Sequence, residues 1–269
     1  MQQGFLIFVV SLAVGAMGSM LGIGGGVLLI PLLTGLFGVP IKTAIGASII
    51  SVIATSSAAG TVYVGRGLAH TRLSMVLEIA TTMGALAGGI TAVLISPRLL
   101  DFAFAALLVY VAFTLRRISI QEGANSPTGL LDTNYTDPFS GQTITYGVRN
   151  LPQGLGASFL AGNISGLLGI GCGIIKVPIM NLVMGVPLRA AIATSNFMIG
   201  VTAAASAGIY FIRGDVNPLI VAPVALGVLI GAVLGASILP RTKNPTIRKL
   251  FAIVLVLVSV EMMLAAFGI

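Results

Sequence analysis

Two copies of one glycine-rich pattern decide how this chain is organised: LGIGGG at residues 21–26 and LGIGCG at residues 168–173. The similarity continues around both copies, because 17 of the 47 positions in 21–67 are identical to those in 168–214 without a gap. Self-similarity at a fixed offset, here 168 − 21 = 147 residues, indicates that the fold contains two copies of one structural unit.

The composition restricts the chain to one class of protein. Charged residues make up 8% of the 269 residues, hydrophobic residues make up 57%, and the mean hydropathy is +1.08. A soluble domain contains about 25% charged residues, so an ordinary soluble enzyme, a disordered chain and a disulfide-rich scaffold are excluded. The single cysteine and single histidine lead us to expect no cofactor and no resident metal. The net charge of +7 is attributed to cytoplasmic loops rather than to nucleic-acid binding.

Ten apolar segments predict an all-α polytopic membrane protein with eight spanning-length helices plus two short half-helices in two inverted repeats. A spanning helix needs ~20 apolar residues, and eight segments approach that length: 4–20, 43–64, 73–95, 99–115, 151–168, 190–212, 218–239 and 250–268. The other two, 27–39 and 174–186, follow the glycine patterns and are too short to cross the membrane as helices. Glycines at 84, 88 and 89, and at 227, 231 and 235, are spaced for close helix packing.

One long polar stretch separates the two repeats. We expect a first transmembrane repeat at 1–117, a cytoplasmic linker loop at 118–149 and a second transmembrane repeat at 150–269. Within the loop, a turn at 137–141 and the alternation Thr143-Ile144-Thr145-Tyr146 are compatible with a small β-hairpin. A disordered linker is the open alternative.

The basic residues predict the orientation of the chain. If each repeat crosses the membrane an odd number of times, so that the repeats are inverted, ten basic residues share one side: Arg66, Arg72, Arg116, Arg117, Arg149, Arg189, Arg241, Lys243, Arg248 and Lys249. The opposite side receives three, Lys42, Arg98 and Arg213. An even number of crossings removes most of this asymmetry. The excess of positive charge in cytoplasmic loops therefore favours inverted repeats with both termini outside.

The glycines of the repeated pattern are the first candidates for a substrate site: Gly22, Gly24, Gly25 and Gly26, with Gly169, Gly171 and Gly173. The pattern lacks the lysine and the βαβ context of a nucleotide-binding loop. It either allows close helix packing or unwinds the chain within the membrane, where free N–H groups can bind an anion. Because both repeats interrupt the chain at matching positions, as secondary transporters do, the second interpretation is favoured.

Side chains close to the two patterns complete the candidate site. Uncharged polar groups can donate hydrogen bonds to an anion, although bonds between helices are an equal alternative; they belong to Ser48, Asn163, Ser165, Ser195 and Asn196. Cys172 replaces the middle glycine of the second pattern, where it either fits as a small residue or contacts a sulfur-containing substrate.

Three charged residues fall inside apolar segments. Lys176 stands where the first repeat has Leu29, and a lysine at that depth is a functional hypothesis by default. It attracts an anionic substrate, balances a buried carboxylate, or extends to the interface. Glu78 and Glu261 are candidates for coupling transport to a proton, with an interfacial position as the alternative for both.

The paired cores "GIGGGVLLIPLL" and "GNISGLLGIGCGIIKVPIM", each followed by Gly-Val-Pro, a basic residue and an A-I-x-x-S stretch, resemble the sulfite exporter TauE/SafE family of membrane permeases. The resemblance covers about residues 4 to 268, and the departure from the family pattern is Cys172, where family members commonly have glycine. It implies transport, usually outward, of sulfur-containing anions such as sulfite and organosulfonates.

The sequence as a whole predicts a secondary transporter, with no enzymatic activity, in a prokaryotic plasma or inner membrane. Its expected partners are a small anionic substrate and the lipid bilayer, with a homo-oligomer possible. An anion channel with a glycine-loop filter is the first alternative. A membrane-embedded enzyme is a weaker one, because clustered histidines, cysteines and paired carboxylates are missing from the sequence.

Overall fold

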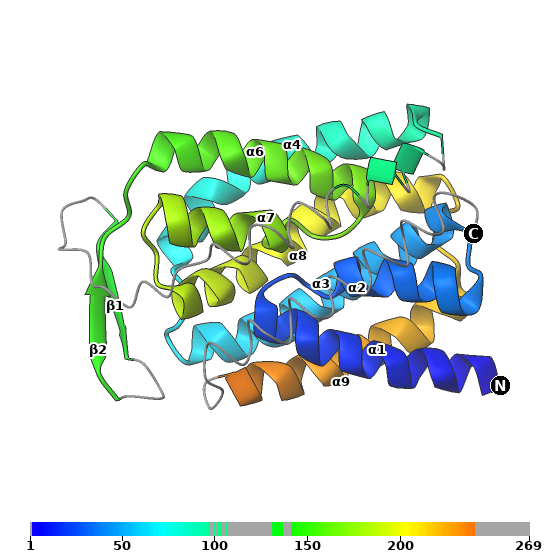
Figure 1. Cartoon of the computed structure of the whole chain (residues 1–269), viewed down its shortest axis with the longest axis horizontal. Helices are drawn as coiled ribbons and strands as arrows, with labels where there is room; N and C mark the ends of the chain where they lie inside the picture. Colours follow the sequence, from blue (N-terminus) through cyan, green and yellow to red (C-terminus); the bar gives the residue numbers. More distant parts are fainter. Residues whose placement is uncertain are drawn as a thin grey trace.

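A computed structural model of the chain describes residues 2–96, 99–100, 102–103, 106, 131–136 and 141–239. Two sets of helices with the same order are separated in the sequence by a two-stranded sheet, which lies at one end of the helical bundle (Figure 1). The first set is α1 (Gln2–Leu21), α2 (Gly26–Pro31), η1 (Leu32–Leu36), α3 (Ile41–Gly65) and α4 (Thr71–Leu94). The second set is α6 (Leu151–Leu168), α7 (Gly173–Pro178), η2 (Ile179–Val183), α8 (Leu188–Ile212) and α9 (Pro218–Ile238).

The long helices pack in pairs that exchange elements between the two sets. Helix α1 lies along α9, α4 lies along α6, and α3 and α8 pack together between these pairs. The outer pairs approach closely because glycines line their interfaces: a Cβ on Gly84 or Gly88 would collide with the backbone of Asn163 in α6. A Cβ on Gly231 would collide in the same way with the backbone of Leu12 in α1. The predicted glycine packing faces are therefore confirmed.

The two short helices begin at the last glycine of each pattern and are 11 residues long, Gly26–Leu36 and Gly173–Val183. Each contains a proline, Pro31 or Pro178, and continues as a π-helix after it. A proline has no N–H to donate within a helix and its ring crowds the preceding turn, so the local widening to π geometry has a direct cause. The predicted short helices at 27–39 and 174–186 are confirmed within a few residues.

Five described helices are long and apolar enough to cross a membrane: α1, α3, α4, α8 and α9. Helix α6 is 18 residues long and is not one of these five. The remaining predicted spans, 99–115 and 250–268, lie almost entirely outside the described residues. The chain is thus a polytopic helical membrane protein whose described part contains five candidate spans.

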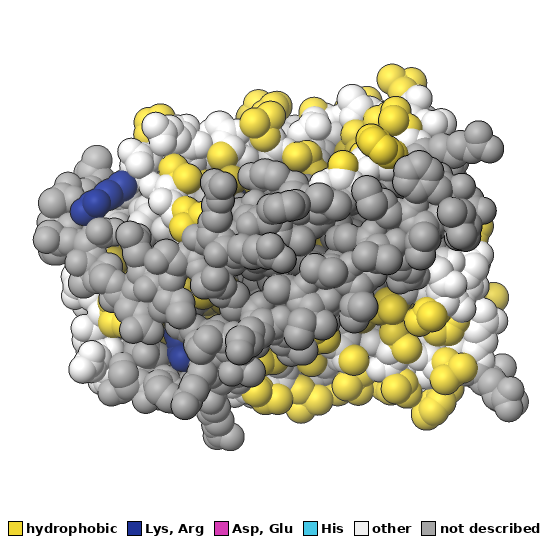
Figure 2. Space-filling model, viewed as in Figure 1, with side chains coloured by type: hydrophobic (Ala, Val, Ile, Leu, Met, Phe, Trp, Pro, Cys, Tyr) yellow, Lys and Arg dark blue, Asp and Glu magenta, His cyan; other side chains and the backbone are white. Residues whose placement is uncertain are grey.

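One face of α4 is suited to contact with lipid. Large apolar side chains are exposed along it at intervals of three or four residues: Met75, Ile79, Met83, Leu86, Ile90 and Leu94. This interval places them on one side of a helix, opposite the glycines that face α6. Hydrophobic side chains are also visible along the flanks of the bundle in Figure 2. Such a surface is expected where hydrocarbon, not water, is the solvent.

The linker contains the β-hairpin that was one of the two expectations for this region. Strand β1 (Thr133–Thr136) pairs antiparallel with β2 (Thr143–Tyr146), with Thr133 opposite Tyr146. The hairpin packs against the turn between α3 and α4, where the rings of His70 and Tyr146 meet edge to face with centroids 5.9 Å apart. The described part of the chain is therefore not all-α, although the strands lie outside the helical bundle (Figure 1).

The imidazole of His70 connects the hairpin to the bundle. Its Nδ1 accepts a hydrogen bond from the N–H of Leu73 at 3.2 Å, and its Nε2 lies 3.0 Å from the carbonyl oxygen of Leu131. Because Nδ1 accepts, Nε2 carries the proton, so the ring is neutral. Burial lowers the pKa of His70 and outweighs the backbone hydrogen bonds that raise it, while the charge of Arg72 adds the smallest lowering contribution.

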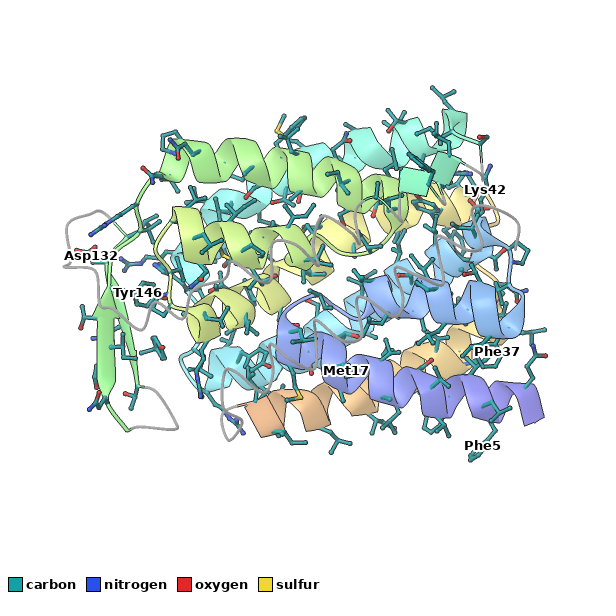
Figure 3. All side chains as sticks on the ribbon, in the orientation of Figure 1. Phe5, Met17, Phe37, Lys42, Asp132 and Tyr146 are labelled. Atoms are coloured by element: carbon teal, nitrogen blue, oxygen red, sulfur yellow. The ribbon has the colours of Figure 1, made fainter. Side chains whose placement is uncertain are left out.

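Several of the described basic residues lie at the two ends of the bundle. Arg66 and Arg72 flank the turn that contacts the hairpin. Arg149 joins them there, since its N–H bonds to the carbonyl of Met184 near the start of α8. Lys42 begins α3 at the opposite end, far from Asp132 and Tyr146 of the hairpin region (Figure 3). Helices α1 and α6 also begin at opposite ends of the bundle in Figure 1.

Candidate functional site

The two glycine patterns form loops that meet inside the bundle. A Cβ on Gly173 would collide with the carbonyl oxygen of Gly22, and a Cβ on Gly26 would lie 3.0 Å from the carbonyl oxygen of Ile170. Both loops are fully buried from residue 21 to 26 and from 168 to 173. The two patterns, 147 residues apart in sequence, are thus adjacent in space, and glycine is required where their backbones touch.

The backbone of each loop is non-helical because of its first glycines. Gly22 and Gly24 have φ of 74° and 72°, and Gly169 and Gly171 have φ of 66° and 71°. These values lie in the left-handed region that glycine adopts without the cost that a Cβ brings. The expected unwinding of the chain within the membrane segment is therefore present at both loops.

Each loop is held by a serine from the other repeat. Ser48 of α3 donates a hydrogen bond to the carbonyl oxygen of Gly169 at 2.6 Å. Ser195 of α8 donates the equivalent bond to the carbonyl oxygen of Gly22 at 2.7 Å. Both serines are fully buried. These bonds satisfy carbonyl groups that the loops remove from helical pairing, and they couple α3 and α8 to the opposite loop.

Two tyrosines and an asparagine fix the helices that lead into the loops. The hydroxyl of Tyr63 donates to the carbonyl of Ser19 at 2.9 Å, and that of Tyr210 donates to the carbonyl of Gly166 at 2.9 Å. Asn196 adds a bond from its side-chain amide to the same Ser19 carbonyl at 2.9 Å. The last turns of α1 and α6 are therefore anchored before the chain unwinds.

The loops differ at the third of the four glycine positions. Gly25 has φ of 78°, whereas Cys172, which replaces it in the second loop, has φ of −74°. A left-handed backbone is costly for a residue with a Cβ, so the cysteine accompanies a changed conformation. Its buried Sγ lies 3.8 Å from the Oγ1 of Thr202 on α8. Cys172 thus fits as a small buried residue and also connects the loop to a polar cluster.

That cluster centres on an ion pair between two different helices. The Nζ of Lys176 on α7 lies 3.3 Å from the Oε2 of Glu78 on α4. The side chain of Lys176 is 1% exposed and that of Glu78 is 13% exposed. Of the three roles expected for Lys176, the contact corresponds to charge balance with a carboxylate that is itself partly buried. The contact is compatible with both positions expected for Glu78.

Hydroxyl groups bind the second oxygen of the Glu78 carboxylate. Thr202 of α8 donates to Oε1 at 2.5 Å, and Thr82, one turn further along α4, donates to the same atom at 3.3 Å. The Sδ of Met198 lies 3.9 Å from the Nζ of Lys176. The carboxylate is therefore held by one ammonium and two hydroxyls in a buried setting, which are groups that bind oxyanions well.

The structure brings most of the expected site residues together. The loop contacts and serine bonds join Gly22, Gly24, Gly26, Ser48, Gly169, Gly171, Gly173 and Ser195. Gly25 packs instead against Val14 of α1, and Asn163 contributes backbone packing to α4. Ser165 supplies the carbonyl that ends α6 at Gly169. Glu261 lies outside the described residues.

Sequence reasoning missed Thr202 and Met198. Met198 gives no polar signal, and threonines within apolar helices commonly bond to their own helix. A signal for Thr202 exists, because it lies seven residues, about two turns, after Ser195 on the same face of α8. Among the described residues, no group of three histidine, cysteine or acidic side chains could hold a metal ion.

Comparisons with known proteins agree with one another. The family model described as "Sulfite exporter TauE/SafE" matches residues 7–262. The chain is 28% identical over 269 residues to "Probable membrane transporter protein YunE" of Bacillus subtilis (strain 168), covering 97% of each chain. It is 26% identical over 235 residues to "Probable membrane transporter protein YdhB" of the same organism, covering 86% of this chain and 88% of that one. No solved structure matches the chain significantly.

Proposed function

Since the chain belongs to the sulfite exporter TauE/SafE family, we propose that it is a secondary transporter that carries small sulfur-containing anions, such as sulfite or organosulfonates, out of the cell. The family and the names of the two relatives indicate a membrane transporter rather than an enzyme. The substrate class and the outward direction go beyond the assignment as a transporter, and both are consistent with the family description.

The observation that carries the proposal is the contact between two buried, unwound glycine loops. Irregular backbone at membrane depth is tolerated where protein buries it or where it lines a cavity. In secondary transporters, interrupted helices from two repeats meet at the substrate site. The reciprocal bonds from Ser48 and Ser195 support a site at this contact, since small motions of α3 or α8 would move the opposite loop.

Inverted repeats are part of the proposal. The exchanged pairing of α1 with α9 and of α4 with α6 is what two copies related by a two-fold axis would produce. The opposite starting points of α1 and α6 in Figure 1 support the same arrangement. The positive charge at the hairpin end supports a cytoplasmic position for that end, in a prokaryotic plasma or inner membrane.

The substrate class is tested by flux into liposomes that contain the purified protein. Radiolabelled sulfite, thiosulfate, sulfoacetate and taurine are offered separately, and we expect saturable uptake of at least one anion above protein-free liposomes. A flux that does not saturate would favour an anion channel. No flux of any of the four above the control would reject the proposed substrate class.

A glycine-to-alanine pair tests the location of the site. Gly24→Ala places a Cβ on a left-handed residue, 3.1 Å from the side chains of Val52 and Ile199, and is expected to reduce flux at least tenfold. Gly208→Ala is the matched control, since no atom lies within 4 Å of the added Cβ in α8. Equal flux in the two variants, at equal amounts of inserted protein, would move the site away from the loops.

A further inference from the structure

We infer that the carboxylate of Glu78 occupies the place of the transported anion at Lys176 and Thr202, so that anion binding is accompanied by protonation of Glu78 and one proton moves with each anion in the same direction. The inference rests on the proposed function and adds its coupling ion. It also names the charged part of the substrate site.

The ligands of Glu78 are those that a small oxyanion would need. One oxygen faces the ammonium of Lys176 at 3.3 Å, and the other accepts from the hydroxyl of Thr202 at 2.5 Å. Lys176 follows the second glycine loop by three residues, and Cys172 of that loop lies 3.8 Å from the Oγ1 of Thr202. The ion pair is therefore continuous with the loop contact proposed as the substrate site.

Charge balance determines what happens when an anion replaces the carboxylate. In the resting site, Lys176 and Glu78 sum to zero. If a monoanion takes the place at Lys176 while Glu78 stays ionised, the buried site carries one uncompensated negative charge, which is costly. If Glu78 takes a proton from the aqueous side that is open, a carboxyl O–H bond forms and the site returns to zero. The anion and the proton then move together.

When an anion takes Lys176 and Thr202, the ligand of Glu78 that remains is the hydroxyl of Thr82, 3.3 Å from Oε1, and no positive charge stays beside the ionised carboxylate. Met75 and Ile79, on either side of it in sequence, are 65% and 69% exposed on the apolar face of this helix. A carboxylate that rotated away from Lys176 would approach that face. Protonation is the less costly change for an acidic group facing hydrocarbon.

Few other titratable groups face this pair from the described elements. Helix α6, which packs along α4, has none between Leu151 and Leu168. Helix α8 has Arg189 and Tyr210, which lie near its two ends. Cys172 faces the cluster, and Arg72 lies six residues before Glu78 on α4. In the described part of the chain, Glu78 is therefore the group suited to exchange a proton when Lys176 changes its partner.

The coupling makes the pH difference part of the driving force. With one proton bound, a site loaded with a monoanion is neutral, so the concentration gradients of the anion and of the proton together decide its direction. Outward transport then requires an outward anion gradient that exceeds the opposing proton gradient. The empty transporter returns with Lys176 and Glu78 paired and no net charge in the membrane.

The test measures accumulation of anion driven by a pH difference. Proteoliposomes receive a monoanionic organosulfonate that shows saturable flux, such as methanesulfonate, which gains no proton near neutral pH. The membrane potential is held at zero with potassium and valinomycin. A difference of one pH unit, acidic outside, should then concentrate the anion inside by about tenfold for one proton per anion. Saturable flux without such accumulation would overturn the inference and leave the proposed transport function standing.

Variants assign the coupling to named groups. Glu78→Gln imitates the protonated carboxyl, so we expect downhill flux without accumulation driven by the pH difference. Accumulation equal to wild type in Glu78→Gln would overturn the role of Glu78. Should this variant fail to insert, Thr202→Val keeps both charges and removes one ligand of the anion.

Thr55→Val is the matched control for Thr202→Val, because Thr55 occupies the equivalent position and donates only to Ser51 of its own helix at 2.9 Å. We expect Thr202→Val to raise the KM for the anion at least fivefold and Thr55→Val to leave it within twofold of wild type. Equal KM values in the two variants would overturn the assignment of Thr202.

Discussion

The two repeats share one skeleton and differ in charge. Equivalent residues hold the two loops: Ser48 and Ser195 bond to opposite glycine carbonyls, and Tyr63 and Tyr210 anchor the preceding helices. The short helices that follow have different interiors. Lys176 of the second repeat pairs with Glu78 of the first, whereas their counterparts are Leu29 in the first repeat and Ala225 in the second.

This difference between the repeats distinguishes the residues needed for packing from the residues that carry charge. Loop contact and helix pairing need the same small and hydroxyl-bearing residues in both halves, because the same backbone approach occurs twice. A single anion needs only one positive charge, and a second lysine at Leu29, which is 1% exposed, would bury another charge without a partner. The duplicated glycines, serines and tyrosines of the loops therefore hold the architecture, and in the proposed transporter the unmatched Lys176 and Glu78 carry the charge.

The two repeats should differ most in stability at the ion pair. Lys176→Met leaves Glu78 buried without its partner, and removal of one member of a buried pair costs about 3–5 kcal/mol. The equivalent change Leu29→Met in the first repeat exchanges two apolar side chains of similar volume and should cost less than about 1.5 kcal/mol. The free energy of unfolding in detergent, measured with denaturant, distinguishes them.

A double variant is the control for Lys176→Met. Adding Glu78→Gln removes the unpaired charge, so we expect the double variant to recover at least half of the lost stability. Equal losses in Lys176→Met and Leu29→Met would mean that the pair contributes nothing special to folding. The two halves would then be equivalent in stability as well as in shape.

Substitutions of equivalent glycines at the loop contact should differ less in their effect on stability. In Gly173→Ala the new Cβ meets the backbone oxygen of Gly22, which cannot move aside, whereas in Gly26→Ala the nearest atom is the side-chain Oγ of Ser48 at 2.5 Å. Forcing an extra carbon into a packed interior costs about 1–3 kcal/mol. We expect Gly173→Ala at the upper end and Gly26→Ala at the lower end, measured by thermal unfolding. A larger loss of stability in Gly26→Ala than in Gly173→Ala would show that the second loop accommodates an added carbon more easily than the first.

Much of the fold follows from the sequence, because composition and self-similarity are global signals. The repeat of LGIGGG at 21–26 as LGIGCG at 168–173 predicted two buried loops, each followed by a short helix. The positions of Pro31 and Pro178 marked where those helices distort. Lys176 was recognisable because a charge within an apolar segment has few physical explanations.

The partners of these residues did not follow from the sequence. The pairing of Lys176 with Glu78 joins residues 98 positions apart, and only the packing of α4, α7 and α8 brings them together. Thr202 remained hidden because a threonine in an apolar helix usually bonds within its own helix. Likewise, the negative φ of Cys172 could not be inferred from the equivalent Gly25.

The smallest expected effect concerns the residue that precedes α4 and its counterpart before α9, where the two repeats cap a helix with different side chains. His70 precedes α4 and accepts a hydrogen bond from the N–H of Leu73, while Asn217, at the equivalent position, precedes α9 and accepts from the N–H of Leu219 at 3.0 Å. Both side chains cap a helix. The histidine alone can titrate near neutral pH.

The sign of the resulting pH dependence follows from the lowered pKa of His70. Below the ordinary value of 6.5, the unfolded chain binds a proton at this position more readily than the folded chain, so stability falls as the pH decreases from 6.5 toward the pKa of the folded state. Protonation of Nδ1 also removes the acceptor for Leu73. His70→Asn keeps an acceptor, as Asn217 does, and removes the titration. We therefore expect the Tm of wild type, relative to His70→Asn, to fall between pH 7.5 and pH 5. Parallel profiles for the two proteins would show that His70 is as insensitive to pH as its counterpart in the second repeat.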